Sequence, residues 1–253
     1  MSKVFDSYAA YYDLLYIDKN YKLEVDYIFK LLKKYKFNSG EILELGSGTG
    51  KHAAYLAGLG FNIHGIDLSE SMINIANSQN KLENISFEVG DVRTYRVDKL
   101  FDVVLSLFHV ASYQSTNSDL QNMFLTASSH LAPGGVFIFD FWYGPAVLNN
   151  LPTIRTKKMN DKIIDVVRVA TPEIRCNKNI VDVNYNIKVT NIHNKQVSVF
   201  NETHSMRYLF MPELEKMLED LNIEILDQLT WMTQDELNLD SWQGIIVAKK
   251  MIK

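Results

Sequence analysis

A glycine-rich turn that begins at Gly46 constrains the fold of this chain more than any other segment. A short apolar run ends at Leu45, glycines follow at Gly46, Gly48 and Gly50, and an apolar pattern with helical spacing starts at His52. The order is strand, turn, helix, which is the repeating unit of an α/β sheet. Glycine has no Cβ, so a ligand can approach this backbone closely, and the helix N-terminus adds free N–H donors. The turn therefore predicts a ligand site at the carboxyl ends of the strands.

The spacing of the glycines and the acid before them narrow the class of ligand. Dinucleotide-binding turns have the pattern Gly-x-Gly-x-x-Gly, whereas this turn reads Gly-x-Gly-x-Gly, with Glu44 two residues before the first glycine. A carboxylate there would repel a pyrophosphate and would suit a ligand with an ammonium group and no phosphate. S-adenosylmethionine, which joins adenosine to a sulfonium and an amino-acid tail, is such a ligand. The alternative is an ordinary strand-to-helix turn that binds nothing.

Two further acids stand at the ends of the second and third predicted strands. Asp67 follows the glycines at the distance where an acid can accept hydrogen bonds from both ribose hydroxyls. Asp91 is expected to accept from the exocyclic amine of adenine, with Val92 beside it and Met72 against the adenine face. The alternative for Asp67 is that it merely precedes a helix whose N-cap is Ser69, and both interpretations can hold at once.

Composition and charge exclude several classes of protein. The chain has 253 residues, of which 47% are apolar and 22% charged, as in one large globular domain or a domain with an insertion. A net charge of −4 argues against a nucleic-acid-binding surface. The single cysteine, Cys176, rules out an internal disulfide. We see no signal peptide and no apolar run of membrane-spanning length, so we expect a cytoplasmic protein with no membrane partner; monomer and homodimer stay open.

Strands and helices alternate up to about residue 142, which predicts a parallel sheet. The texture then changes, because residues 162–210 contain strand-like alternating stretches with a hairpin signal at 191–195. A helix at 212–221 and two more strands close the chain. The predicted fold class is α/β, a Rossmann-like, seven-stranded, mostly parallel sheet with helices on both faces, plus an inserted antiparallel β-sheet over the active-site edge.

Residues 39–141 resemble the class I S-adenosylmethionine-dependent methyltransferases. Residues 44–50 match the first motif of that family, Asp67 the ribose acid, Gly90 and Asp91 the adenine motif, and residues 133–135 the turn before the fifth strand. The resemblance implies S-adenosyl-L-methionine as cofactor, S-adenosyl-L-homocysteine as product and no metal. The cofactor-binding residues that we expect are Tyr21, Glu44, Gly46, Ser47, Gly48, Asp67, Leu68, Met72, Asp91, Val92 and Leu107.

Other segments resemble the sugar-nucleotide N-methyltransferases, a subgroup that methylates the amine of nucleotide-linked amino sugars. These segments are residues 12–21, residues 139–144 with the downstream antiparallel sheet, and residues 204–208. The resemblance implies an N-terminal helical lid and helix at 1–38. It also implies a cofactor-binding Rossmann-like domain at 39–145 and 211–253, and an acceptor-binding β subdomain at 146–210. The implied partner is a small-molecule acceptor, with a sugar nucleotide as the specific expectation.

The catalytic candidates follow strand four or belong to the N-terminus. His109 is the natural general base, because its pKa is ordinarily near neutral, and Tyr113, Tyr12 and Tyr16 are placed beside it. A satisfied histidine at a strand end is the alternative for His109. The tyrosine-rich N-terminus is interpreted equally well as a helix that packs its rings on the core or as a lid, in which Tyr12, Tyr16 and Tyr21 close over the sulfonium.

The candidates for acceptor binding are Trp142 and Tyr143 at the end of strand five, and His204 and Arg207 near the end of the insertion. Arg207 would meet an anionic part of the acceptor, such as a phosphate. The alternatives are a core-edge aromatic for Trp142 and a surface pair for His204 and Arg207. The histidines show no metal-ligand spacing, which again predicts no metal. Two other functions stay open, namely O-methyl transfer to a saccharide or another small hydroxylated acceptor, and a non-catalytic cofactor-binding subunit.

Overall fold

A computed structural model describes residues 19–252 of the chain. The predicted lid residues Tyr12 and Tyr16 lie outside the described residues. The first described helix is α2 (Tyr21–Lys34), in which the Asn20 side chain caps the N-terminus by accepting a hydrogen bond from Leu23 N. Its apolar face is buried, as the helical spacing predicts.

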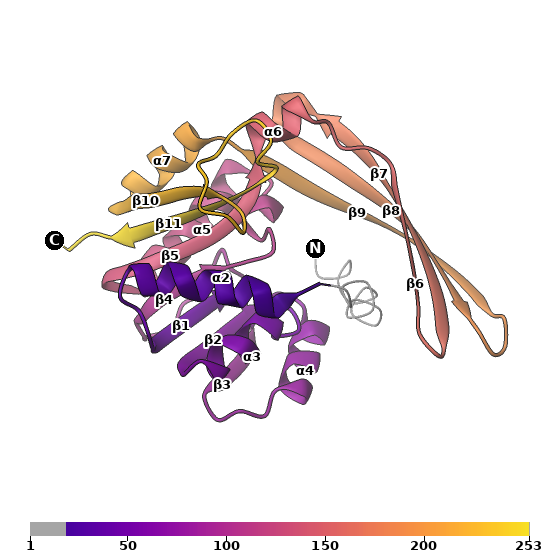
Figure 1. The fold of residues 1–253 in the computed structure, drawn as a ribbon, viewed down its shortest axis with the longest axis horizontal. Coiled ribbons are helices and arrows are strands. Elements are labelled where there is room, and N and C mark those ends of the chain that lie inside the picture. The colour runs from indigo at the N-terminus through magenta and orange to yellow at the C-terminus, as the bar shows by residue number, and fades with distance from the viewer. Residues whose placement is uncertain (1–18, 253) are drawn as a thin grey trace.

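Seven strands of one continuous eleven-stranded sheet form the body of the molecule (Figure 1). Five strands are parallel, in the spatial order β3-β2-β1-β4-β5; β11 runs antiparallel to β5, and β10 runs antiparallel to β11. The predicted Rossmann-like, mostly parallel sheet is confirmed. The strands are β1 (Gly40–Leu45), β2 (Phe61–Asp67), β3 (Ile85–Val89), β4 (Phe101–Ser106), β5 (Leu131–Tyr143), β10 (Ile223–Thr230) and β11 (Gln243–Lys250).

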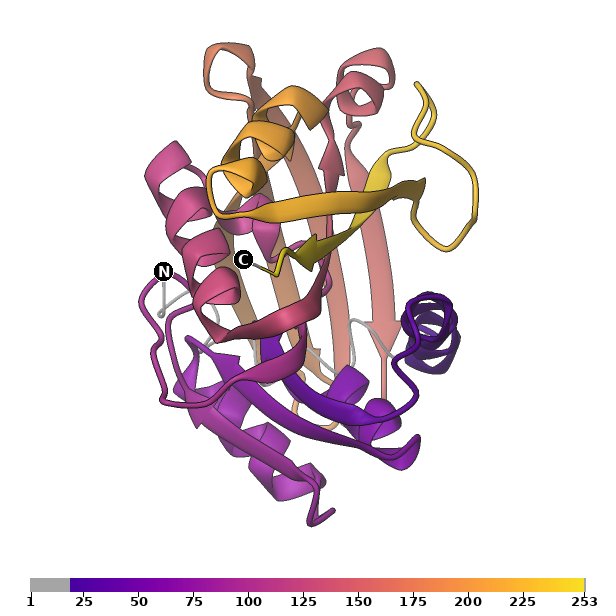
Figure 2. The same ribbon diagram turned by 90° about the vertical axis from the view of Figure 1, so that its left-hand side faces the viewer.

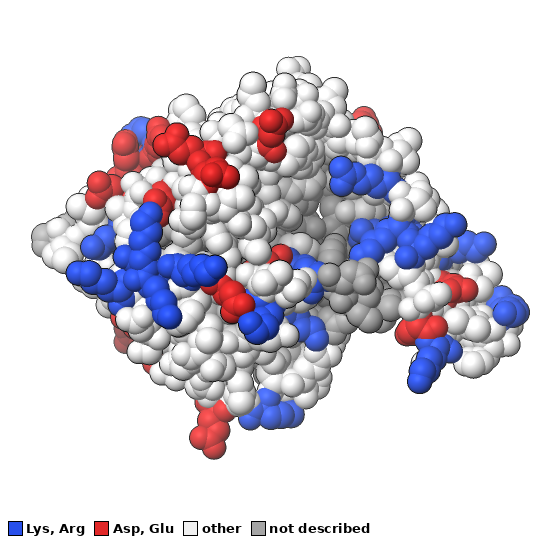
Figure 3. Space-filling model, viewed as in Figure 1, with Lys and Arg blue, Asp and Glu red and all other residues white. Residues whose placement is uncertain are grey.

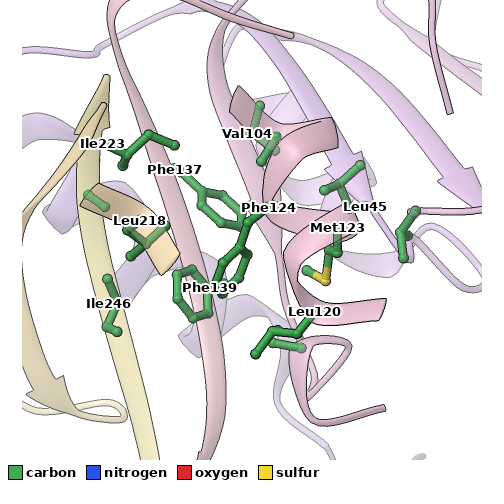
Figure 4. Close-up of a cluster of buried hydrophobic side chains, with 14 of the residues drawn as sticks. Leu45, Val104, Leu120, Met123, Phe124, Phe137, Phe139, Leu218, Ile223 and Ile246 are labelled. Atoms are coloured by element: carbon green, nitrogen blue, oxygen red, sulfur yellow. The ribbon is translucent and has the colours of Figure 1, made fainter. Parts of the chain in front are cut away.

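Helices cover both faces of this sheet because its strands are apolar on both sides. The side chains of Leu43 and Leu45 join a core cluster with α5 (Asn117–His130) and α7 (Met211–Glu219), as Figure 4 shows in part. Ile42, on the opposite face of β1, belongs to a second cluster with α2 and α3 (Lys51–Gly58). The remaining helices are α4 (Glu70–Gln79), α6 (Gly144–Asn149) and the short 3-10 helices η1 (Ala111–Tyr113) and η2 (Cys176–Lys178).

The segment before the fifth strand differs from the simple turn that the sequence predicts. β5 already begins at Leu131, which pairs with Phe101, whereas Val103 pairs with Val136. Between these two pairs β5 has more residues than β4. The extra residues of β5 form an irregular bulge, in which Gly134 has a φ of +79°. The bulge lies at the amino end of β5, far along the strand from its carboxyl end.

An antiparallel sheet of four strands follows β5 and extends away from the body (Figures 1 and 2). Its hairpin turn after Asn191 forms as predicted, because Asn191 N donates to Gln196 O and Lys195 adopts a positive φ. β9 leaves this sheet and pairs in parallel with the end of β5, Trp142 with Tyr208. The strands are β6 (Arg155–Asn160), β7 (Ile164–Arg175), β8 (Ile180–Asn191) and β9 (Val197–Leu209).

β6 was not expected from the sequence. Its residues read Arg-Thr-Lys-Lys-Met-Asn, which lacks apolar alternation, and only Met159 is buried. β6 is the edge strand of the inserted sheet, and charged side chains on an edge strand discourage pairing with other chains. Figure 3 shows Lys and Arg side chains gathered over this part of the molecule. An edge position therefore explains a strand that the hydrophobic pattern could not predict.

Candidate active site

One cleft opens at the carboxyl ends of the parallel strands, between the glycine turn and the inserted sheet. The turn after β1 and the ends of β2 and β3 line one part of it, and η1, β5, β8 and β9 line the other. The cleft brings together twelve of the residues predicted from the sequence: Gly46, Gly48, Asp67, Leu68, Met72, Asp91, Val92, Leu107, His109, Tyr113, Trp142 and His204.

The glycine turn is held by backbone hydrogen bonds to the neighbouring strand. Gly46 N and Ser47 N both donate to Ile66 O, at 2.8 and 2.9 Å. Gly46 has a φ of +78°, and a Cβ on it would lie 2.4 Å from the side chain of Val110. Gly48 has a φ of +53°, and a Cβ there would meet nothing within 4 Å. Gly46 is therefore required by packing as well as by its backbone conformation, whereas Gly48 leaves open space at the cleft.

The carboxylate of Asp67 is fixed from two sides. Oδ2 accepts from Gly48 N and Oδ1 accepts from Ser69 N, each at 2.9 Å. Burial raises the pKa of Asp67, and the two backbone hydrogen bonds oppose that rise. Ser69 also caps α4, because its side chain accepts from Met72 N. Asp67 thus orders the start of the helix and also lines the cleft, and its contact with a ribose stays a prediction.

Glu44 lies beneath the turn and not on the wall of the cleft. Its side chain is 1% exposed, and its Oε2 has no hydrogen-bond partner within residues 19–252. Burial, together with the charge of Asp67, raises the pKa of Glu44 to about 8. Its Oε1 is 3.7 Å from Nδ1 of His52, whose Nε2 is 2.8 Å from Glu24. The sequence pattern placed Glu44 in the cleft wall, but β1 is buried on both faces at this point, so its side chain stays inside.

The end of the cleft that is predicted to receive adenine combines apolar walls with an ion pair. Leu68, Met72, Val92 and Leu107 line it. Asp91 is engaged by Arg93, whose Nη2 is 2.6 Å from Oδ2 and whose Nε is 2.9 Å from Oδ1. Hydrogen bonds from Arg93 lower the pKa of Asp91, so the carboxylate is held ionised. An amine that donates a hydrogen bond to Asp91 can therefore use only the carboxylate lone pairs that Arg93 does not already occupy.

His109 sits on a strained loop against a fully buried acid. Phe108 and His109 have φ values of +67° and +68°, which is uncommon for residues other than glycine. The backbone N–H of His109 donates to Asp140 Oδ1 at 3.0 Å, and its Nδ1 lies 3.0 Å from Oδ2, within ion-pair distance but out of line for a hydrogen bond. Burial opposes ionisation of Asp140, yet His109 and a hydrogen bond from Gln243 lower its pKa. Asp140 therefore holds the loop in place.

A second histidine reaches the cleft from the inserted sheet. His204 Nδ1 lies 2.7 Å from Tyr113 Oη, and His204 Nε2 lies 3.5 Å from Glu202 Oε2. Tyr185 packs its ring edge-to-face on His204 and also lines the cleft, as does Met206. Sequence reasoning missed Glu202, Tyr185 and Met206, because placing them needs the register of β8 against β9. The alternation of side chains along β9 is the one signal that could have found Met206, two residues after His204.

The other predicted residues lie elsewhere. Ser47 is buried in the turn, and Tyr21, at the start of α2, packs its ring on His52 at a centroid distance of 5.1 Å. Tyr143 packs against Phe141 at the end of β5. Arg207 is separated from His204 by β9 itself, since side chains three positions apart point to opposite faces of a strand. Its Nη2 donates to Glu213 at 2.7 Å, so the structure does not bring Arg207 to the acceptor side of this cleft.

Within residues 19–252, no group of three or more His, Cys, Asp and Glu side chains could hold a metal ion. Among the described helices, none combines the length and the apolar character that crossing a membrane requires. The absence of a metal from the reaction stays a prediction from the sequence.

Comparison with known proteins gives a family for the segment that holds the glycine turn. Residues 42–135 match the family model described as a methyltransferase domain. This segment is thus similar to a methyltransferase domain. The match confirms the family resemblance that the glycine turn and the two acids predict.

Relatives of the methyltransferase domain extend the comparison. The chain is 29% identical over 140 residues to a dTDP-3-amino-3,4,6-trideoxy-alpha-D-glucopyranose N,N-dimethyltransferase of Streptomyces venezuelae, covering 54% of this chain and 58% of that protein. Matches to this and a second N,N-dimethyltransferase, of Saccharopolyspora spinosa, span little more than half of their lengths, 58% and 55%. The Bacillus subtilis protein YqeM is 25% identical over 98% of this chain and 97% of its own.

Solved structures of the same fold match most of the length of this chain. An S-adenosylmethionine-dependent methyltransferase from Clostridium acetobutylicum superposes with a TM-score of 0.80 at 21% identity, over 98% of this chain and 99% of that one. Streptomyces venezuelae DesVI gives a TM-score of 0.80 at 23% identity, over 95% and 97%. The predicted fold, including the inserted sheet, is thus found in known methyltransferases.

The residues around the cleft of the methyltransferase domain fit S-adenosylmethionine. Gly48 leaves room beside the backbone, Asp67 is a fixed acceptor for hydroxyl groups, and the apolar wall of Met72 and its neighbours suits an adenine. Glu44 has a buried oxygen without a partner in the described chain, next to the turn. An unpaired buried acceptor costs free energy, which a cationic ligand nearby would offset. These acceptors therefore suit a nucleoside that carries a positive charge and no phosphate.

Proposed function

We propose that this protein is an S-adenosylmethionine-dependent methyltransferase that acts on a small molecule, and that its acceptor is the amine of a nucleotide-linked amino sugar. One observation carries the proposal: a single cleft joins the glycine turn and Asp67 at one end to His109, Tyr113 and His204 at the other. Relatives named as dTDP-amino-sugar N,N-dimethyltransferases support the acceptor class. The reaction is expected in the cytoplasm, with the protein as a monomer or a homodimer.

The cofactor half of the cleft binds and orients. Asp67 would accept hydrogen bonds from the ribose hydroxyls, and the open backbone at Gly48 would lie against the ligand. Glu44, beneath the turn, would stabilise the ammonium group of the methionine tail from inside the protein. When bound, the cofactor would supply a methyl group on a sulfonium, whose carbon an acceptor could attack in line with S-adenosylhomocysteine as the leaving thioether. The site must hold the acceptor atom, the methyl carbon and the sulfur in line. Such positioning can lower the activation barrier by several kcal/mol, about 7–11 kcal/mol in intramolecular reactions.

The acceptor half supplies polar groups with fixed partners. Asp140 faces Nδ1 of His109, which leaves Nε2 as the nitrogen that can meet an acceptor. Tyr113 Oη can accept a hydrogen bond from an acceptor amine while it donates its own proton to His204 Nδ1. A neutral amine is already a nucleophile, so these groups need only orient it and receive a proton. A hydroxyl acceptor would need a stronger base at the methyl group.

O-methyl transfer stays the second candidate, because malonyl-[acyl-carrier protein] O-methyltransferases also match this chain, one of Bacillus cereus at 30% identity over 55% of the chain. The third is a cofactor-binding subunit without catalysis.

The test is an assay with radiolabelled S-adenosylmethionine and two matched nucleotide sugars, one with an amine and one with a hydroxyl at the same carbon. Label on the amine alone supports the proposal. Label on the hydroxyl, or cofactor binding by calorimetry with no transfer to any acceptor of either class, contradicts it.

A further inference from the structure

A second pocket lies on the other face of the inserted sheet from the cleft. Along β9 the side chains of His204 and Met206 line the cleft, whereas those of Ser205 and Arg207 line the second pocket. The segment between η1 and α5 separates the two, because Tyr113 lies in the cleft wall and Thr116 in the wall of the second pocket. The second pocket is therefore a separate site that the reaction described above does not use.

Arg207 is a buried cation with an unused donor. The residue is 5% exposed, and its Nη2 donates to Asn117 Oδ1 at 2.6 Å and to Glu213 Oε2 at 2.7 Å. Its Nε is buried and has no hydrogen-bond partner within the described chain. The other oxygen of Glu213 accepts from Phe210 N, so this carboxylate is committed to the start of α7. A buried guanidinium N–H without an acceptor is costly, and a ligand oxygen in the pocket would relieve that cost.

Arg175 repeats this arrangement on β7, in register with Arg207 across β8, which lies between the two strands. Its Nη2 donates to Asp182 Oδ1 at 2.6 Å, while its Nε is buried without a partner among residues 19–252. Asp182 also accepts from Ser205 Oγ, so its charge is already shared between two donors. Lys178, in η2, is exposed at the rim of the same pocket. Two arginines with unused Nε–H groups and one lysine thus line a space beside which Asp182, Glu213 and Asp119 are each paired, Asp119 with Arg93 and with Thr116 Oγ.

The N-terminus of a long helix points into the same space. Thr116 is the N-cap of α5, its side chain accepts from Asp119 N, and both Thr116 and Asn117 line the pocket. The first N–H groups of a helix have no partner inside it, and the helix dipole adds partial positive charge at this end. Side-chain cations and helix N–H groups together make the donor set that proteins use for phosphate.

We propose that this second pocket binds the phosphate group of a small ligand. The Nε–H groups of Arg175 and Arg207 donate to the phosphate oxygens, Lys178 adds charge at the rim, and the N-terminus of α5 completes the site. The proposal is independent of methyl transfer, because it uses none of the residues of the cleft. Phosphate binding is therefore expected whether or not the acceptor assignment is right.

Titration of the full chain with inorganic phosphate, followed by calorimetry at low salt, tests the site. Because a charged hydrogen bond is lost, Arg175→Gln should weaken phosphate binding by roughly tenfold, and Lys178→Gln by a smaller factor. Lys188→Gln is the matched control, since it removes the same charge from an exposed position of β8 outside the pocket. Circular dichroism checks that each variant is folded, and Arg207→Lys, which keeps the charge and loses the Nε donor, should also weaken binding.

Equal phosphate affinity of the Arg175, Lys178 and Lys188 variants would overturn the proposal. So would competition between phosphate and S-adenosylhomocysteine, because that places the anion in the cleft. Acetate that binds as tightly as phosphate would make the pocket a carboxylate site and would overturn it as well. A parallel titration with glycerol phosphate identifies the source of the group: tighter binding of the ester indicates a phosphorylated metabolite, and tighter binding of inorganic phosphate indicates the free ion.

Discussion

The two halves of the cleft are built in different ways. In the cofactor half, the position of the short turn after β1 is fixed by hydrogen bonds to β2. The backbone N–H groups of residues 46–48 donate to β2 and to the side chain of Asp67, the last residue of β2. In the acceptor half, Tyr113 and His204 are 91 residues apart in sequence, and they meet only because β9 pairs with the end of β5. The first half depends on local backbone conformation and the second on long-range register. Changes to backbone should therefore damage the first half most, and changes to side chains the second.

The largest effect is expected from a single methyl group at Gly46. Gly46→Ala forces a positive φ on alanine and places its Cβ against Val110, so the free energy of unfolding should fall by about 2–5 kcal/mol. Gly60→Ala is the control, because Gly60 has a φ of +97° but a Cβ added there would meet nothing within 4 Å; it should cost only the backbone strain, about 1–2 kcal/mol. Urea denaturation measures both. Equal losses would show that packing on Val110 does not hold the turn.

The next effect concerns Asp67, which is bonded to the turn and is proposed to bind the cofactor. Asp67→Asn keeps one acceptor oxygen and loses the charge, so affinity for S-adenosylhomocysteine should fall about 10- to 100-fold. Asp98→Asn, at an exposed position outside the cleft, makes the same chemical change and should leave affinity unaltered. Calorimetry distinguishes the two variants. If both bind the cofactor product like the native protein, Asp67 orders α4 and does not grip a ribose.

The contrast between the two halves explains how far sequence alone could go. The glycine spacing, Asp67 and the apolar residues near them were predictable, because each is fixed by its distance along the chain from one turn. Glu44 was misplaced because a strand buried on both faces hides a side chain that the pattern counts as available. Glu202, Tyr185 and Met206 were missed because no local pattern encodes which face of β8 and β9 meets the cleft; only alternation along β9, once His204 is assigned to the cleft, points to Met206. The predicted place of Arg207 in the cleft was wrong for the same reason, since a shift of one residue along β9 moves a side chain to the other face of the sheet.

A side-chain change in the acceptor half should separate turnover from binding. Tyr113→Phe removes the hydroxyl that contacts His204, a hydrogen bond of about 1–1.5 kcal/mol, so kcat should fall roughly tenfold. Affinity for S-adenosylhomocysteine and the free energy of unfolding should change little. Tyr143→Phe is the control, because Tyr143 lies outside the cleft. If the two phenylalanine variants turn over at the same rate, the contact between Tyr113 and His204 is structural.

The smallest effect is the release of a proton from Glu44 when the cofactor binds. This release sharpens the comparison because Glu44 belongs to the cofactor half alone. Burial and the charge of Asp67 raise the pKa of Glu44 from its ordinary value of 4.5 to about 8, so Glu44 is mostly protonated at pH 7 before binding. Unfolded chains lose that proton near pH 4.5, so the raised pKa lowers the stability of the free protein progressively as pH rises from about 4.5 to 8.

An ammonium group above the turn favours the ionised form, so binding should lower this pKa and release a proton. Calorimetry of S-adenosylhomocysteine binding at pH 7, in buffers of different ionisation enthalpy, should show release of up to about one proton by the native protein. Glu44→Gln, which cannot ionise, should show markedly less release and weaker binding, by about tenfold if the native protein releases nearly a whole proton. The same release from both proteins would mean that the proton comes from another group and that Glu44 stays protonated beneath the bound cofactor.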